Sequence, residues 1–423
     1  MTYDRVGAFA AAVLATLGAT AANAQAVTAT SVDRNVGVLD RPRPDYDAVG
    51  MRSGAFILLP RLTTTIDFDD NIYATQTQKT SDTLVLIQPE LTVRSDWSRN
   101  MIEGYARAAF DEYLSHGSEN TEEYQLRGDG RYDIADDSNI NGGASISRLM
   151  EPRYAAATTQ GVRHPVRYNL GELNIGAVQT FNRIRFVEDI RLADFSYENA
   201  VDALGASVLE KDRDRTEVRE SGRVEYAYSP DTAFFLAGEL NQVTYRLQPP
   251  ASLFDRNADG YNLSLGTRLD LSHLVRGEFR VGYLNENYDT AAFRSTSGMS
   301  MNGKLDFFVT PLTTVTVAAD RSVGASADPR SSGYLTTSGG VEVDHELRRN
   351  VILSGQVNYA SDDYKGIDRT DDRWTARVGA TYLVNRTVGV SLYYNYTDVS
   401  SSGADRINGY KINQLMLALV LQR

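Results

Sequence analysis

The chain has 423 residues, is 42% hydrophobic and 23% charged, contains no cysteine and carries a formal net charge of −12. Its negative mean hydropathy, −0.35, excludes a bundle of transmembrane helices, and 24 Tyr with 14 Phe are too many aromatic residues for a disordered chain. The acidic balance argues against a nucleic-acid partner, and the absence of cysteine excludes disulfides and thiol chemistry.

The first 24 residues have the pattern of a cleavable signal peptide. Arg5 precedes an apolar run from Gly7 to Thr20, and the small-x-small sequence Ala22-Asn23-Ala24 follows that run. The alternative is a buried N-terminal helix, but the polar residues that come next leave such a helix nothing to pack against. We therefore expect export from the cytoplasm, with cleavage after Ala24 or Ala26.

Residues 25–53 are expected to form a polar periplasmic lead outside the main fold. The sequence Asp40-Arg41-Pro42-Arg43-Pro44-Asp45-Tyr46 contains two prolines, which remove backbone donors and favour extended, unpaired backbone. We expect this lead either to dock a periplasmic or inner-membrane export partner or to fold into a lumen as a plug. The candidate residues for that contact are Arg41, Arg43, Asp45 and Tyr46.

From residue 54 to residue 423 the chain repeats segments of about ten to fifteen residues in which apolar and polar residues alternate. One such segment runs from Leu263 to Leu271, and another from Trp374 to Val384. A period of two indicates strands with one apolar and one polar face, whereas a helix needs a period of 3.6. About eighteen segments of this kind predict an all-β protein, an antiparallel transmembrane β-barrel over 54–423.

The connections between these segments alternate between short and long. The short ones, such as Asn182-Arg183 and Ser229-Pro230-Asp231, are built from residues that turns favour. The predicted long loops cover 71–82, 151–165, 198–214, 248–259, 287–297, 325–333 and 361–372. Short periplasmic turns and long outer loops are typical of bacterial outer-membrane barrels. We therefore expect the outer membrane of a Gram-negative bacterium as the location.

Aromatic residues near the predicted strand ends favour interfacial girdles, although core packing would explain them equally well on their own. They are Trp97, Tyr113, Tyr132, Tyr226, Tyr228, Tyr283, Tyr359, Tyr382 and Tyr396. In the last segment we expect the alternating leucines Leu415, Leu417, Leu419 and Leu421 to face lipid. The chain ends in Arg423, where barrel proteins commonly carry an aromatic residue.

No recognisable catalytic motif is present: the sequence lacks a G-x-S-x-G elbow, an H-E-x-x-H motif, a P-loop and a dinucleotide fingerprint. The four histidines, His116, His164, His273 and His345, are too far apart in sequence for close metal-ligand spacing. We expect no enzyme activity, no metal and no cofactor.

Charged residues on the polar faces of the predicted strands are candidates for lining a lumen. They are Glu103, Arg107, Arg127, Asp129, Arg131, Arg219, Arg223, Glu225, Arg268, Asp270, Lys304, Asp306 and Arg377. The two signs interleave, which suits either a hydrated passage or a network of ion pairs that holds the wall in shape. Arginine rows beside carboxylates also hydrogen-bond sugar hydroxyls and uronates, so a carbohydrate cargo is one hypothesis.

The stretch from Asp40 to Asn100 resembles the outer-membrane family of β-barrel porins of type 2. The resemblance rests on the Asp40–Tyr46 sequence, on Phe68-Asp69-Asp70-Asn71-Ile72-Tyr73 and on Ser95-Asp96-Trp97-Ser98. Members occur often in alphaproteobacteria, frequently beside exopolysaccharide loci. The resemblance implies a large barrel and a route for an exopolysaccharide across the outer membrane.

These patterns together predict a passive outer-membrane channel, with secreted exopolysaccharide as the first hypothesis for its cargo. The alternatives are a general diffusion porin and a non-conducting barrel with a structural or adhesive role. The expected partners are outer-membrane lipid and lipopolysaccharide, the barrel assembly machinery, polysaccharide cargo and periplasmic export proteins, with no nucleic acid.

Overall fold

The computed structural model describes residues 36–154, 159, 161–271 and 274–423. The predicted signal peptide, residues 1–24, lies outside the described residues. The elements are β1 (Met51–Ser53), β2 (Phe56–Asp69), β3 (Asp82–Ser95), β4 (Met101–Tyr113), η2 (Gly117–Glu119), β5 (Thr121–Ala135), β6 (Ser138–Met150), β7 (Arg167–Phe181), β8 (Ile184–Tyr197), β9 (Ala200–Val201), β10 (Ser207–Val208), η3 (Lys211–Arg213), β11 (Arg215–Ser229), β12 (Thr232–Tyr245), β13 (Ala258–Leu271), β14 (Val275–Tyr288), β15 (Thr296–Thr310), β16 (Thr313–Gly324), β17 (Gly333–Arg348), β18 (Val351–Lys365), β19 (Thr370–Leu383), β20 (Val388–Ser402) and β21 (Tyr410–Gln422).

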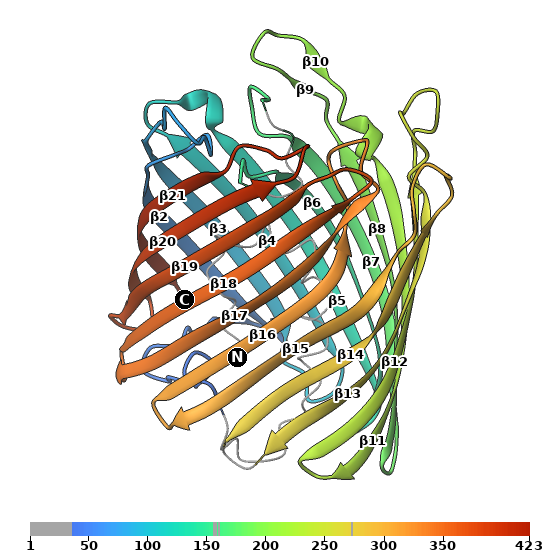
Figure 1. Ribbon diagram of the computed structural model, residues 1–423. Coiled ribbons are helices and arrows are strands. Elements are labelled where there is room, and N and C mark those ends of the chain that lie inside the picture. The colour runs from blue at the N-terminus through green and yellow to red at the C-terminus, as the bar shows by residue number, and fades with distance from the viewer. Residues whose placement is uncertain (1–35, 155–158, 160, 272–273) are drawn as a thin grey trace.

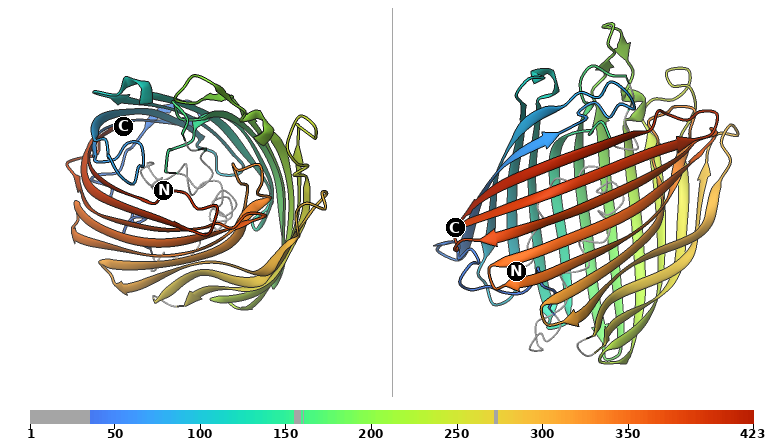
Figure 2. Two further views of the ribbon diagram at one scale, coloured as in Figure 1. Left: turned by 45° about the horizontal axis from the view of Figure 1, so that its top comes forward. Right: turned by 60° about the vertical axis from the view of Figure 1, so that its left-hand side comes forward.

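Eighteen of these strands, β2–β8 and β11–β21, close into one antiparallel ring. Each strand pairs with its neighbours in sequence, β8 pairs with β11, and β2 closes the ring by pairing with β21 from Arg61 to Asp69. The strands are tilted against the barrel axis, and the view along the barrel shows the closed wall (Figures 1 and 2). The predicted all-β barrel of about eighteen strands is confirmed.

The alternation in sequence becomes an alternation of burial across the wall. On β21 the odd-numbered leucines are exposed by 42–45%, whereas Met416, Ala418 and Val420 between them are at most 9% exposed. The register places Leu417 beside Ile66 of β2 and Leu392 of β20, which are also exposed. The exposed faces of these strands therefore contribute to a largely apolar outer surface, as a wall in lipid requires.

Tight connections lie at one end of the barrel and longer ones at the other. The connections of the first kind include 136–137, 182–183 and 230–231, and those of the second include 70–81, 151–166 and 198–214. In the described part of the chain, no helix has the length and apolar composition needed to span a bilayer. By the rule for outer-membrane barrels, the tight turns mark the periplasmic end.

The predicted long loop 361–372 is wrong, because β18 continues to Lys365 and β19 begins at Thr370. The polar residues of that stretch remain in strands because their inward carboxylates find partners there. Asp362 accepts a hydrogen bond from Thr336 Oγ1 at 2.7 Å and forms an ion pair with Arg373 at 3.0 Å. The connection itself covers only 366–369.

The lead preceding the barrel ends in a short strand. β1 pairs with the first residues of β2, from Phe56 to Leu58, on the side where β21 pairs further along. Residues 37–47, which we call the strap, come just before β1 and carry Arg41 and Arg43.

Candidate functional site

The inner face of the barrel carries the charged residues singled out by the sequence. The strand registers place all of them on the face opposite the exposed apolar side chains. They are Glu103 and Arg107 on β4; Arg127, Asp129 and Arg131 on β5; Arg219, Arg223 and Glu225 on β11; Arg268 and Asp270 on β13; Lys304 and Asp306 on β15; and Arg377 on β19. Their role in passage remains a prediction.

Two of these residues, Arg223 and Arg268, meet at a third, Glu225, whose side chain is 2% exposed. Arg223 pairs with Glu225 and also reaches Glu278 of β14 at 2.7 Å, while Arg268 Nη1 lies 3.3 Å from Glu225 Oε2. Arg185 of β8 approaches the same oxygen at 3.8 Å. Side chains from strands two and three places apart can meet in this way only on the concave side of a curved sheet.

Aromatic rings take part in this inner wall as well. The Arg223 guanidinium lies 4.0 Å from the centre of the Phe235 ring, and that of Arg377 lies 4.3 Å from the Tyr393 ring. Sequence reasoning missed Phe235 and Tyr393, although each lies at a strand position whose side chain points to the polar inner face. An aromatic residue at such a position, instead of among the lipid-facing residues, could have indicated both of them.

Most other candidate charges pair with near neighbours on the wall. Arg127 Nε lies 2.7 Å from Asp129 and Arg131 Nε 2.8 Å from Asp133. Arg219 Nε lies 3.2 Å from Glu239. Because each arginine lies beside a carboxylate, the electrostatic field that these groups produce together is small.

The wall from β16 to β21 and on to β2 also carries uncharged polar side chains. Its buried inward hydroxyl and amide groups are Thr63, Thr65, Thr314, Thr316, Ser391, Asn395 and Thr397, and they lie among the buried carboxylates Asp67, Asp69, Asp344, Glu346, Asp362 and Asp371. Sequence reasoning singled out charged residues and missed these uncharged ones. The interior therefore offers neutral donors and acceptors between its charged groups.

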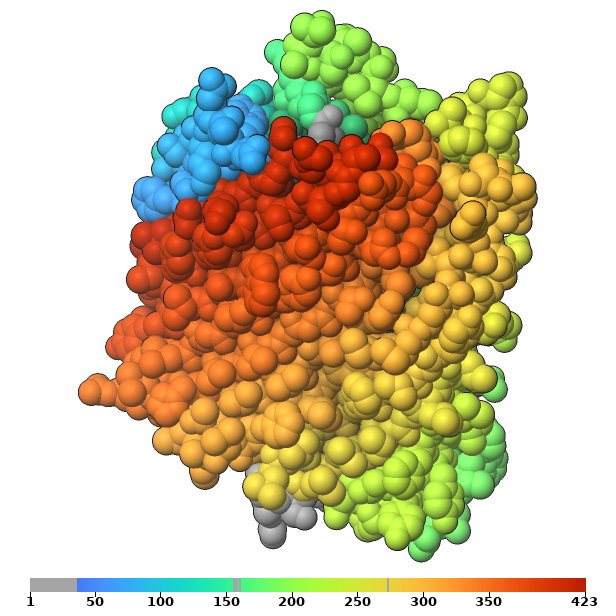
Figure 3. Space-filling model, in the orientation of Figure 1, coloured from blue at the N-terminus to red at the C-terminus, as the bar shows by residue number. Residues whose placement is uncertain are grey.

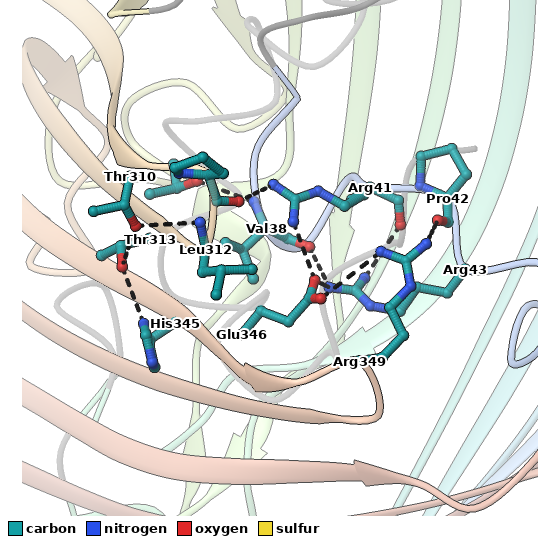
Figure 4. A network of polar contacts seen from close by, with 12 residues as sticks. Val38, Arg41, Pro42, Arg43, Thr310, Leu312, Thr313, His345, Glu346 and Arg349 are labelled. Carbon is teal, nitrogen blue, oxygen red and sulfur yellow. Dashed lines mark hydrogen bonds and ion pairs between the residues drawn. The ribbon is translucent and has the colours of Figure 1, made fainter.

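The strap lies against the inner wall at the tight-turn end of the barrel. Figure 4 shows Arg41 and Arg43 directed at Glu346 of β17, with distances of 3.3 and 3.1 Å to its Oε2. Tyr46 packs with the buried cluster of Val38, Ile352 and Leu383. Asp45 is on the exposed side of the strap. The structure therefore brings Arg41 and Arg43 together and leaves Asp45 apart from them.

At the opposite end, tyrosines form an inner collar. Among the described strands, eight carry an inward tyrosine within two residues of the outer end: Tyr113, Tyr168, Tyr197, Tyr245, Tyr288, Tyr334, Tyr364 and Tyr410. The prediction that Tyr113 belongs to a lipid-facing girdle is therefore wrong. It sits one residue out of phase with the lipid face and packs against Leu84, Leu86 and Ala109.

Outer-loop side chains rest on this collar. The guanidinium of Arg213 lies 4.1 Å from the Tyr197 ring, and that of Arg369 lies 4.2 Å from the Tyr364 ring. The hydroxyl of Tyr410 donates to the backbone carbonyl of Tyr154 at 3.0 Å, so the residues just after β6 contact β21. The connection 198–214 rises above the outer end of the barrel (Figures 1 and 3).

A buried ion-pair group fixes these loops to one another. Arg213 pairs with Glu151 and with Glu210, the latter at 2.9 Å. Burial raises the pKa of the Glu151 carboxyl against the opposing attraction of Arg213. Such a group holds the loops in one arrangement, since separating the pair would leave buried charges without partners.

The histidines take no part in a joint site. His116 Nδ1 lies 2.8 Å from Asp82, His164 bonds the Ser118 carbonyl and His345 bonds Thr313, while His273 lies outside the described residues. Over the described ranges, no three His, Asp or Glu side chains are grouped so that they could hold a metal ion.

A closed barrel of 18 antiparallel strands, apolar outside and polar inside, defines a porin-like outer-membrane barrel. The chain belongs to the family described as "Putative beta-barrel porin 2", whose model matches residues 43–423. The protein is accordingly an outer-membrane protein of a Gram-negative bacterium. This family points to a channel or receptor rather than an enzyme.

Several solved outer-membrane proteins align with this chain at low sequence identity. A mutant of the ferric enterobactin receptor PfeA from Pseudomonas aeruginosa aligns with a TM-score of 0.46 and 7% identity, covering 89% of this chain and 81% of that one. OpdK from the same organism, solved with vanillate, gives 0.44 and 11%, covering 86% and 99%. The siderophore receptor PirA, also from P. aeruginosa, gives 0.42 and 10%, covering 86% and 80%. A comparison with curated proteins finds no match.

Proposed function

We propose that this barrel is a passive channel through which a secreted polysaccharide crosses the outer membrane. One observation carries the proposal: the interior interleaves arginine side chains with hydroxyl, amide and carboxylate groups. Sugar hydroxyls hydrogen-bond to groups of these kinds, and uronate carboxylates suit arginine forks. An 18-stranded barrel is also wide enough for an aqueous channel.

The lipid-facing surface and the closed ring support the expected surroundings of this channel. The outer face would contact outer-membrane lipid and lipopolysaccharide, and insertion would require the barrel assembly machinery. Periplasmic export proteins would deliver the polymer to the tight-turn end.

Single-channel conductance in a planar bilayer tests the proposal. The refolded protein is measured alone, with polygalacturonate as an acidic polysaccharide and with dextran as a neutral one. We expect steady conductance that polygalacturonate reduces and that Arg223→Gln makes less sensitive to the polymer. Glu188→Gln, on the exposed outer face of β8, is the matched control and should behave like wild type.

Two other functions remain distinguishable in the same experiment. Conductance that neither polymer changes would indicate a general diffusion porin. The outer loops resting on the tyrosine collar favour a non-conducting structural or adhesive barrel as the second candidate. Absence of conductance, persisting after deletion of residues 27–50, would contradict the channel and support that candidate.

A further inference from the structure

The strap occupies an inner surface that fits it closely. Val38 is fully buried and packs on Ile352 of β18 and Leu383 of β19. Its backbone N–H donates to Thr314 Oγ1 of β16 at 3.0 Å. By strand register these three wall residues all face inward. The start of the strap is therefore fixed inside the barrel, on β16, β18 and β19.

One carboxylate collects the basic side chains around the strap. Glu346 Oε2 accepts from Arg43 at 3.1 Å and from Arg41 at 3.3 Å, and Arg349 Nη1 lies 3.7 Å from Oε1. The Arg43 side chain is 0% exposed and that of Glu346 only 6%. Removing this carboxylate would leave three guanidinium groups together with the charge of Arg43 buried, which is strongly unfavourable.

Arg43 also holds the shape of the strap itself. Its Nη2 donates to the carbonyl of Val38 at 2.7 Å, and its backbone N–H donates to Asp47 Oδ2 at 2.5 Å. Arg43 therefore links the internal fold of the strap to its docking on Glu346.

Beyond Arg43, two wall side chains donate hydrogen bonds to backbone carbonyls of the strap. Arg386 Nε donates to the carbonyl of Pro44 at 2.7 Å, and Gln422 Nε2 donates to that of Tyr46 at 3.3 Å. The chain then continues into β1, which pairs with β2 and belongs to the barrel. The strap is thus tethered at one end and held at the other by Val38 and Glu346.

We propose that the strap is a gate at the periplasmic mouth, latched by Glu346. This inference rests on the proposed channel and adds its regulation. A second layer of chain takes up about 10 Å next to a sheet, so the docked strap narrows the opening on the β16–β21 side. Breaking the contacts to Glu346 lets the strap swing out on its β1 tether and widens the path.

The test uses the natural absence of cysteine. Glu346→Gln removes the latch, and Glu188→Gln is the matched control. A Cβ at Gly37 would lie 3.8 Å from the Thr314 side chain, so Gly37→Cys with Thr314→Cys forms a reversible lock. Val38→Cys, labelled with a maleimide, reports whether the strap is docked, since Val38 is fully buried.

We expect Glu346→Gln to speed maleimide labelling at position 38 and to raise unitary conductance about twofold, from the width of one chain layer in a barrel of this size. In the lock variant carrying Glu346→Gln, oxidation should restore wild-type conductance and reduction should raise it again. This reversal within one protein excludes misfolding as the cause.

Faster labelling with unchanged conductance would overturn the gate while leaving the channel proposal intact. Labelling as slow in Glu346→Gln as in wild type would overturn the latch. If no variant conducts although labelling shows the strap released, both the channel and its gate are contradicted.

Discussion

At the scale of single residues, two deeply buried carboxylates stand out on the inner wall. Glu346 and Glu225 each serve several arginines, and both side chains are at most 6% exposed. A carboxylate shared among guanidiniums is harder to replace than any one of its partners, because its loss leaves several like charges unpaired.

Replacing the shared carboxylate Glu346 should therefore destabilise the docked strap more than replacing one of its arginines. Glu346→Gln breaks the buried pair completely and should destabilise the docked strap by about 3–5 kcal/mol. Arg43→Met removes one charge but leaves Glu346 with Arg41 and Arg349, so its loss should be smaller. Maleimide protection of Val38→Cys measures both. Equal losses would contradict the shared-carboxylate explanation.

A second residue-scale prediction concerns pH at the outer end of the closing seam. Burial alone would raise the pKa of Asp70. Hydrogen bonds from the backbone N and Nδ2 of Asn413, together with attraction to Lys79, outweigh burial and lower this pKa. Both Asn413 bonds measure 2.7 Å. A lowered folded-state pKa means that this contact stabilises above the ordinary aspartate pKa of about 4 and is lost as the pH falls below it.

Asp70→Asn should therefore lower the thermal transition at pH 7, and the difference should shrink as the pH falls below about 4 and through the lowered pKa of Asp70. Thermal melts of the two proteins across this range provide the measurement. A difference that stays constant with pH would show that the charge on Asp70 is not responsible.

At the scale of elements, each strand must fit two surroundings, because alternate side chains face the lipid and the interior. β21 presents leucines to lipid at every second position and turns Gln414, Met416, Ala418 and Val420 to the interior. The same phase rule explains Tyr113, whose place on β4 sends its ring inward rather than into a lipid girdle.

Leu417 lies midway along β21, between exposed Ile66 and Leu392 on the neighbouring strands. Leu417→Arg should lower the free energy of unfolding by about 2–4 kcal/mol, because a basic side chain at the bilayer midplane destabilises the barrel by that amount. Yield of the heat-modifiable folded band on a gel measures the effect. Leu204→Arg, at a 95% exposed loop position, is the control and should fold normally. Unchanged yield for Leu417→Arg would contradict its placement in lipid.

The outer loops and the strap are fixed to the inner wall by different contacts. The loops at the outer mouth rest on the tyrosine collar through stacked arginines, whereas the strap rests on an apolar anchor and one carboxylate. Each arrangement brings together segments far apart in sequence, and each sits on the inner face near a strand end.

For the whole molecule, closure depends on a single seam between the first and last barrel strands. β2 and β21 pair over Arg61–Asp69, with Thr65 opposite Ala418 on the inner face. Without that seam both strands would expose unpaired backbone groups to hydrocarbon, which a membrane protein cannot tolerate.

Thr65→Cys with Ala418→Cys should therefore form a disulfide across the seam on oxidation. Because the chain has no other cysteine, a shift of the unfolded band on a non-reducing gel reports that bond alone. Thr65→Cys with Leu419→Cys places the second thiol on the opposite face and should remain reduced. Linkage of the control pair would indicate a register shifted by one residue.

Much of the architecture follows from sequence patterns, because they are local. Strand number, antiparallel order and the inward phase of Arg223 or Arg377 all follow from period two and from the alternation of short turns and long loops. Where the pattern was polar throughout, as at 361–372, the sequence suggested a loop. Partners on the next strands, such as Thr336 and Arg373, keep those residues in β18 and β19.

The sequence by itself therefore determined the class of protein, its two faces and the residues available to the interior, since the side chains of a strand alternate strictly. Only the tertiary structure decided which of them meet. Arg223 reaches Glu278 because the wall curves, and Arg43 reaches Glu346 because the lead folds back inside the closed ring. Curvature and closure arise from pairing across the whole chain, so no single stretch of sequence contains them.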